Sequence, residues 1–157
     1  MLFRSIYAIA NERRVPILWH QAAAFPKESM LEYANPVLLD RVARAFPEMP
    51  MILAHFGLPW GPETVQLMRK HSQIFTDVSA RLYRPWEMVD ALMRAIEYRV
   101  TDRILFGSDF PIQTTSEALE TFRALPDAHP GRADLPRELI EDIITNRPMS
   151  LIWDDMT

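Results

Sequence analysis

The sequence contains no cysteine. This absence excludes disulfide bonds, thiolate nucleophiles and cysteine-ligated zinc. A bound metal ion would therefore have to be held by His, Asp or Glu side chains. The absence of disulfides also fits a reducing compartment, and we expect a cytoplasmic protein.

Glycine is scarce as well, with only four residues in 157. None of them occurs in a G-x-G spacing, so a Gly-rich phosphate-binding loop is not expected. The sequence also has no G-x-S-x-G motif, which leaves a serine hydrolase of the nucleophile-elbow type without support.

Long apolar runs and excess positive charge are missing too. No run approaches the roughly 18 apolar residues of a membrane-spanning helix, and charged residues from Arg4 to Arg14 interrupt any secretory signal. The formal net charge of −4 offers no basic surface to nucleic acid or anionic lipid. We therefore expect neither a nucleic-acid nor a membrane partner, and a small molecule as substrate.

Short apolar runs alternate with longer amphipathic segments along the chain. The apolar runs predict buried strands over residues 15–20, 51–54, 74–78 and 103–106. Helical spacing and helix-start residues predict helices over 2–14, 36–46, 62–71, 85–99, 115–125 and 136–144, with a short terminal helix opening at Pro148. This alternation is typical of an α/β fold with parallel strands. No linker interrupts it, so we expect one domain over residues 1–157.

Metal-competent side chains stand where three of these strands end. His20 closes the first strand, His55 follows the second and Asp109 follows the fourth. In parallel α/β folds chemistry gathers at the carboxyl ends of the strands. Imidazole and carboxylate are both ligands for zinc and related divalent ions. Each residue also has a purely structural explanation, because a histidine can be hydrogen-bonded in the core and an aspartate can serve a turn.

Three segments that contain these residues resemble consecutive motifs of the amidohydrolase-related family. They are Pro-Ile-Leu-Trp-His at 16–20, Ile-Leu-Ala-His-Phe-Gly at 52–57 and Arg-Ile-Leu-Phe-Gly-Ser-Asp-Phe-Pro at 103–111. Residues 70–80 are similar to the family's seventh strand, and residues 143–148 to its closing helix. The resemblance implies the C-terminal half, strands five to eight, of a TIM (β/α)₈ barrel.

The resemblance also implies roles for the strand-end residues. His20 corresponds to a metal ligand, His55 to a residue that activates metal-bound water or binds the metal, and Asp109 to a metal ligand or proton acceptor. The implied cofactor is a divalent metal, with zinc expected and manganese or iron as alternatives. The implied reaction is hydrolysis of a carbonyl-containing small molecule. The alternatives are decarboxylation within the same superfamily and a truncated, non-catalytic remnant.

One part of the family pattern is absent. The family carries a His-x-His pair on its first strand, and this sequence contains no His-x-His. We therefore expect a domain truncated at its N-terminus, with about half of the barrel missing. Because a partial sheet exposes unpaired backbone groups at its edges, we also expect homo-oligomers or association through those edges.

Residues in the loops beside the strand ends are candidates for binding substrate. Trp60 could line an aromatic pocket, Ser79 could contact substrate, and Arg81 and Arg84 could bind a substrate carboxylate in bidentate fashion. Of the two arginines we select Arg84. The alternatives are core packing for the aromatic ring and surface ion pairs for the arginines.

Overall fold

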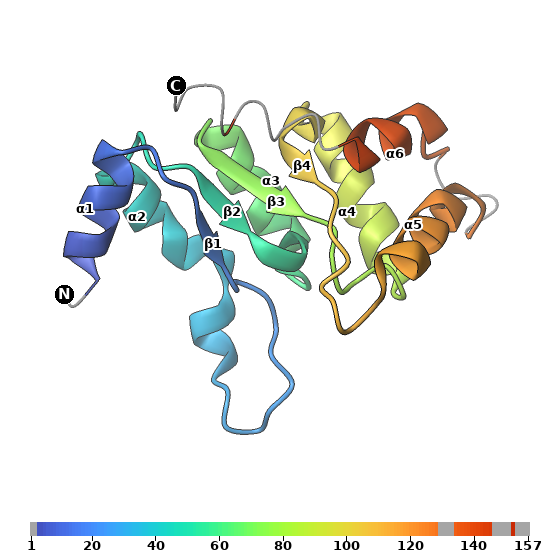
Figure 1. The fold of residues 1–157 in the computed structure, drawn as a ribbon, viewed down its shortest axis with the longest axis horizontal. Helices are drawn as coiled ribbons and strands as arrows, with labels where there is room; N and C mark the ends of the chain where they lie inside the picture. Colours follow the sequence, from blue (N-terminus) through green and yellow to red (C-terminus); the bar gives the residue numbers. More distant parts are fainter. Residues whose placement is uncertain (1–2, 129–133, 146–151, 153–157) are drawn as a thin grey trace.

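The centre of the fold is a four-stranded parallel sheet with the strand order β1-β2-β3-β4 (Figure 1). The strands are β1 (Ile17–Trp19), β2 (Met51–Leu53), β3 (Ile74–Asp77) and β4 (Ile104–Leu105). The computed structural model describes residues 3–128, 134–145 and 152. All four predicted strands are present, each shorter than its apolar run. The prediction of a parallel α/β fold is confirmed.

Within the described ranges, six α-helices are interspersed with the strands, and the last two both follow β4. They are α1 (Arg4–Glu12), α2 (Asp40–Ala45), α3 (Gly61–Lys70), α4 (Pro85–Glu97), α5 (Thr115–Ala124) and α6 (Arg137–Ile144). Figure 1 shows α1 and α2 at the β1 end of the sheet and α5 and α6 at the β4 end. Within the described part of the chain, no helix combines the length and apolar character needed to cross a membrane. The predicted terminal helix at Pro148 lies outside the described residues.

Short 3₁₀ turns account for most differences from the predicted helices. Asn35 begins a helix as predicted, because its side chain accepts a hydrogen bond from the backbone N–H of Val37 at 2.9 Å. The first turn after it, Pro36–Leu39, is however a 3₁₀ helix, and α2 follows only at Asp40. Further 3₁₀ turns occur at Leu31–Ala34, Ala54–Gly57, Thr101–Arg103 and Leu125–Asp127.

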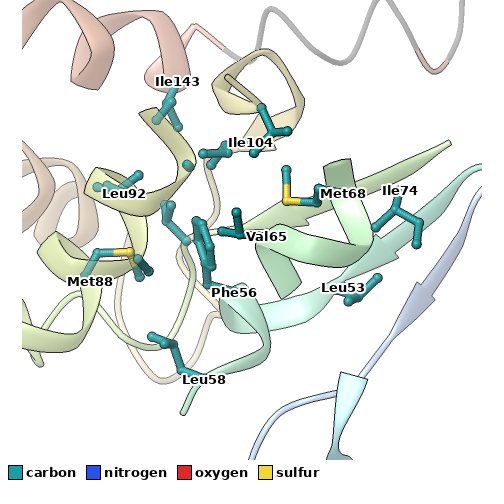
Figure 2. Close-up of a cluster of buried hydrophobic side chains, with 14 of the residues drawn as sticks. Leu53, Phe56, Leu58, Val65, Met68, Ile74, Met88, Leu92, Ile104 and Ile143 are labelled. Carbon is teal, nitrogen blue, oxygen red and sulfur yellow. The ribbon is translucent and has the colours of Figure 1, made fainter. Parts of the chain in front are cut away.

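All six helices pack against one face of the sheet. Met51, Leu53, Ile74 and Ile104 are fully buried on that face, in one core with buried residues from every helix. Figure 2 shows the centre of this core, where side chains from α3, α4 and α6 meet the strands. Each buried aliphatic side chain contributes about 1.5–3 kcal/mol. Consecutive strands in sequential order, with every helix on one side, are the connectivity of a (β/α)₈ barrel rather than of a doubly wound sheet.

The opposite face of the sheet is also apolar but only partly covered. Side chains alternate between the faces of a strand, so the register places Leu18, Ile52 and Phe75 together on this face. Phe75 and Leu105 pack with Ile152 in a second, smaller core, against which Ile52 is partly buried. At the β1 end, by contrast, Leu18 is 63% exposed. This face therefore lacks cover where the sheet begins.

The turn after β2 reverses direction through three consecutive left-handed residues. His55, Phe56 and Gly57 have φ angles of 60°, 55° and 64°. A residue with a Cβ adopts this region at a cost, and Gly57 sits where there is no space for one. The turn is buried, and Phe56 is completely shielded from solvent. This packing holds the turn in its strained conformation and so fixes His55.

Asp40 joins the start of α2 to the end of α3. Its Oδ1 accepts hydrogen bonds from His71 Nε2 at 2.8 Å and from Lys70 Nζ at 2.5 Å. These hydrogen bonds, the one from His71 first, lower the pKa of Asp40 from 3.8 to about 2. Because the folded-state pKa of Asp40 lies below its ordinary value, the ionised Asp40 carboxylate stabilises the fold above about pH 4. This stabilisation is lost as the pH falls through about 2.

Replacement of Gly57 by alanine should destabilise the fold strongly. A Cβ at this position would lie 2.1 Å from Thr64 Oγ1 and 2.8 Å from Pro36 Cγ, at a φ of +64°. We expect the free energy of unfolding, measured by urea denaturation, to fall by about 2–4 kcal/mol. Gly61→Ala is the matched control, because its Cβ would meet the nearest atom at 3.4 Å. Equal effects of the two substitutions would contradict the assigned role of Gly57.

Asp40→Asn should lower stability in a pH-dependent way. At pH 7 we expect a loss of about 1 kcal/mol, because the side chain is partly exposed to solvent. The difference from the unmodified chain should shrink between pH 4 and pH 2 as Asp40 itself becomes protonated. Thermal unfolding at a series of pH values measures this difference. Asp90→Asn, in the exposed pair with Arg94, is the control and should change stability by less than about 0.5 kcal/mol.

Candidate active site

A cavity of about 270 Å³ lies at the carboxyl ends of the strands. Its lining includes His20, which follows β1, His55, which follows β2, and Asp109, which follows β4. Because neighbouring parallel strands end at the same edge of a sheet, residues far apart in the sequence meet there. The three predicted strand-end residues therefore share one cavity.

The two histidines are direct neighbours but differ in exposure. Their ring centroids are 5.1 Å apart, and the rings meet edge to face at 71°. His55 is 7% exposed, whereas His20 and Asp109 are both solvent-exposed. One imidazole is therefore held by its surroundings, and the other two side chains stand at the open side of the cavity.

Ser79 and Asp77, at the end of β3, hold His55 in place. The Nδ1 of His55 lies 2.9 Å from Ser79 Oγ and 3.2 Å from the Ser79 carbonyl oxygen. Asp77 Oδ1 accepts hydrogen bonds from the backbone N–H groups of His55 at 3.1 Å and of Ser79 at 2.9 Å. The Ser79 hydroxyl donates a third, short hydrogen bond to the same oxygen. Both the backbone and the ring of His55 are thus tied to β3.

The loops that follow β2, β3 and β4 each contain a residue with an unusual, left-handed backbone conformation. His55, Ala80 and Asp109 have φ angles of 60°, 56° and 58°. For residues with a Cβ this left-handed region costs about 1–3 kcal/mol, and such residues cluster where function requires a particular side-chain direction. All three line the same cavity. Arg14 and Arg99 are also left-handed but do not line the cavity, so a part of the backbone strain lies at the candidate site.

Arg81 is the cation in the wall of the cavity. It is 5% exposed, and its Nη2 donates a hydrogen bond to the Ala23 carbonyl oxygen at 3.1 Å. Its guanidinium also lies 5.4 Å from the centroid of the Phe25 ring, within the range of a cation–π contact. Arg81 thereby joins the loop after β3 to the loop after β1. The sequence placed both Arg81 and Arg84 in the loop after the third strand and did not distinguish between them.

The three residues predicted to bind substrate lie outside the wall of this cavity. Ser79 is buried, and its hydroxyl faces His55. Trp60 immediately precedes α3, where its carbonyl oxygen accepts hydrogen bonds from Thr64. Arg84 is exposed and lies over the ring of Tyr83 at 5.6 Å. The structure therefore brings Arg81, rather than Arg84, beside the histidines.

The donor chemistry of the cavity suits a divalent cation, but the number of converged ligands is too small. Two imidazoles and a carboxylate face the cavity, and these are common zinc and manganese ligands. Within the described residues, no group of three or more His, Asp or Glu side chains is placed so that it could hold a metal ion. The described part of the chain thus offers donors of the right type without a complete ligand set.

Solved structures of similar fold are TIM barrels and enzymes. An uncharacterised TIM-barrel protein from Bordetella bronchiseptica matches with a TM-score of 0.74 and 22% identity, over 96% of this chain and 50% of that protein. A Lactobacillus casei protein, provisionally assigned as a metal-dependent hydrolase, matches with a TM-score of 0.74 and 19% identity, over 98% and 44%. A manganese-bound dihydroxybenzoic acid decarboxylase from Polaromonas sp. JS666 matches with a TM-score of 0.62 and 14% identity, over 96% and 53%.

The chain spans about half the length of these solved structures. It therefore has the fold of half a TIM barrel, as the sequence predicted. No curated protein sequence matches it. The family model for amidohydrolases, in contrast, matches residues 1–146, nearly the whole chain. This match establishes that the chain belongs to the amidohydrolase family.

Proposed function

We propose that this chain carries the water-activating part of a metal-dependent hydrolase site that acts on a carbonyl group of a small molecule. The observation that supports the proposal is convergence. His20, His55 and Asp109 come from the ends of three strands and line one cavity. Membership of the amidohydrolase family supports the same class of chemistry.

His55 is the proton acceptor in this proposal. Its ring is buried and held at Nδ1, so Nε2 is the nitrogen left to accept a proton from water in the cavity. A positioned histidine of this kind contributes about 10²-fold to 10⁴-fold to a rate. Because Ser79, just after β3, holds the ring before substrate arrives, little reorganisation is needed when the proton moves.

His20 and Asp109 are the residues that would hold a divalent cation, with zinc expected and manganese or iron as alternatives. Their exposure leaves them free to meet ligands from outside the described residues. A bound divalent cation lowers the pKa of a water ligand towards ~7. The manganese in the Polaromonas decarboxylase supports a cation of this class. Association through the open sheet edges is our proposal for how the site is completed.

The walls of the cavity suit a small molecule with an apolar portion. Ala23, Ala24, Phe25 and Ile112 supply apolar surface to the cavity wall. Trp60 and Arg84 stand in loops at the same edge of the sheet and are retained as candidates for substrate contact, whereas the hydroxyl of the buried Ser79 is engaged by His55 and Asp77. Their contribution would come from parts of the substrate that extend beyond this cavity.

Arg81 favours decarboxylation as the second candidate reaction. A buried guanidinium in the cavity wall is suited to a carboxylate, which it binds as a bidentate partner. The Polaromonas enzyme of similar fold is a decarboxylase of a hydroxylated benzoic acid. The third alternative, a non-catalytic remnant, predicts neither reaction.

His20→Ala should weaken metal binding. The described residues hold no complete ligand set, so we expect weak binding of Zn²⁺ or Mn²⁺, and at least about a tenfold further loss of affinity when one donor is removed. Equilibrium dialysis followed by elemental analysis measures the bound metal. His71→Gln is the matched control, since His71 pairs with Asp40 and does not line the cavity. Equal affinities of the unmodified and His20→Ala chains would refute the metal site.

The reaction can be identified with metal-supplemented protein. We expect hydrolysis in a panel of lactones and amides, with kcat/KM lowered about 10²-fold or more by His55→Ala. Release of CO₂ from hydroxylated benzoic acids, without hydrolysis of the panel, would instead establish the decarboxylase. Absence of both reactions in associated protein with bound metal would identify the non-catalytic alternative. His71→Gln again serves as the control and should leave the rate unchanged.

A further inference from the structure

His55 is surrounded by more hydrogen-bonding groups than a base alone requires. Its ring nitrogen Nδ1 has two oxygen neighbours, Ser79 Oγ at 2.9 Å and the Ser79 carbonyl oxygen at 3.2 Å. Histidine, serine and the adjacent carboxylate of Asp77 are all at least partly buried. In such a setting the direction of each hydrogen bond follows from which atoms carry protons.

The carbonyl oxygen settles the first direction. A carbonyl can only accept, so a lone pair on His55 Nδ1 would face the lone pairs of the Ser79 oxygen at 3.2 Å. A proton on Nδ1 turns the same contact into a hydrogen bond. The Ser79 carbonyl therefore favours the form of the ring with hydrogen on Nδ1.

Asp77 settles the second direction. Its Oδ1 already accepts the backbone N–H groups of His55 and Ser79, which marks this oxygen as an acceptor. The one proton of the Ser79 hydroxyl is donated to that oxygen. The hydroxyl is thereby left with lone pairs only towards His55, so it too accepts from Nδ1–H. Both neighbours of Nδ1 require the same tautomer.

We propose that Asp77 and Ser79 are positioning residues that hold neutral His55 as its Nδ1–H tautomer, with the lone pair of Nε2 available to the cavity. The inference deepens the proposed function and rests on it for its catalytic meaning. A histidine can accept a proton or bind a cation only through an unprotonated nitrogen. The opposite tautomer would place N–H where the proposed chemistry needs a lone pair. Asp77 acts here through Ser79, without contact with the substrate.

The tautomer can be observed directly in metal-free protein without substrate. The full chain is labelled with ¹⁵N-histidine, treated with chelator and studied by long-range ¹H–¹⁵N correlation at a pH where the imidazoles are neutral. His55 is assigned by the signals lost in His55→Gln. We expect a protonated-type resonance for Nδ1 and an unprotonated-type resonance for Nε2. The reverse pattern would overturn the proposal.

Two substitutions of Asp77 separate the roles of its oxygen and its charge. Asp77→Ala frees the Ser79 hydroxyl to donate to Nδ1, so we expect the Nδ1 resonance to shift towards the unprotonated type. Asp77→Asn keeps an acceptor oxygen for the three donors and should preserve the tautomer. An unchanged tautomer in folded Asp77→Ala would overturn the role of Asp77.

Ser79→Ala keeps the proposal falsifiable if Asp77→Ala does not fold. It removes one of the two acceptors and leaves the carbonyl, so we expect Nδ1 to stay protonated while its proton resonance shifts towards that of a weaker hydrogen bond. An unchanged proton resonance would overturn the role of the hydroxyl. Because no metal or substrate is used, loss of the expected tautomer contradicts this inference, whereas failure of metal binding or hydrolysis contradicts only the proposed function.

Discussion

The parallel hydrogen bonding between neighbouring strands is the constraint on which the rest of this structure depends. It aligns Trp19 with Leu53 and Leu53 with Thr76, so the strands end at one edge. The same register directs one set of side chains into the helical core and the other set to the opposite face. The residues that directly follow the strands are therefore close to one another in space. A common edge brings His20, His55 and Asp109 to one cavity although as many as 89 positions separate them in the sequence.

Alignment of the strands does not by itself orient a side chain, and the loops supply that second requirement. The left-handed residues after β2, β3 and β4 turn the chain sharply, at a cost that the surrounding packing has to offset. At His55 this packing consists of Phe56, which is fully buried, and Gly57, which lies against Thr64 and Pro36. The hydrogen bond from the His55 backbone N–H to Asp77 further stabilises this conformation. His55 is therefore the most rigidly held of the three candidate residues, and the two exposed ones are the more adaptable.

The sequence predicts what depends on local pattern and fails where several loops must be placed together. Short apolar runs identified all four strands, and His20, His55 and Asp109, which were chosen by their position after those runs, line one cavity. The contact between Ser79 and His55 joins two turns, and each turn contains a non-glycine residue in the left-handed region. Residue propensities do not predict such conformations, so the sequence did not indicate this contact. For the same reason the sequence did not show that Arg81, rather than Arg84, lines the cavity. Nothing in the alternation of apolar and polar residues shows which arginine turns inward.

The incomplete ligand set and the uncovered apolar face have one geometric origin. A closed (β/α)₈ barrel carries eight strand ends around its rim and fills its interior with side chains from all strands. Four strands provide half of such a rim, which accounts for donors of the right chemistry in too small a number among the described residues. The same four strands provide half of an interior, so Leu18 remains 63% exposed where a neighbouring strand would cover it. Any chain that pairs in parallel with the edge of β1 that no described strand occupies would cover one flank of Leu18 and, by the same register, extend the rim beside His20.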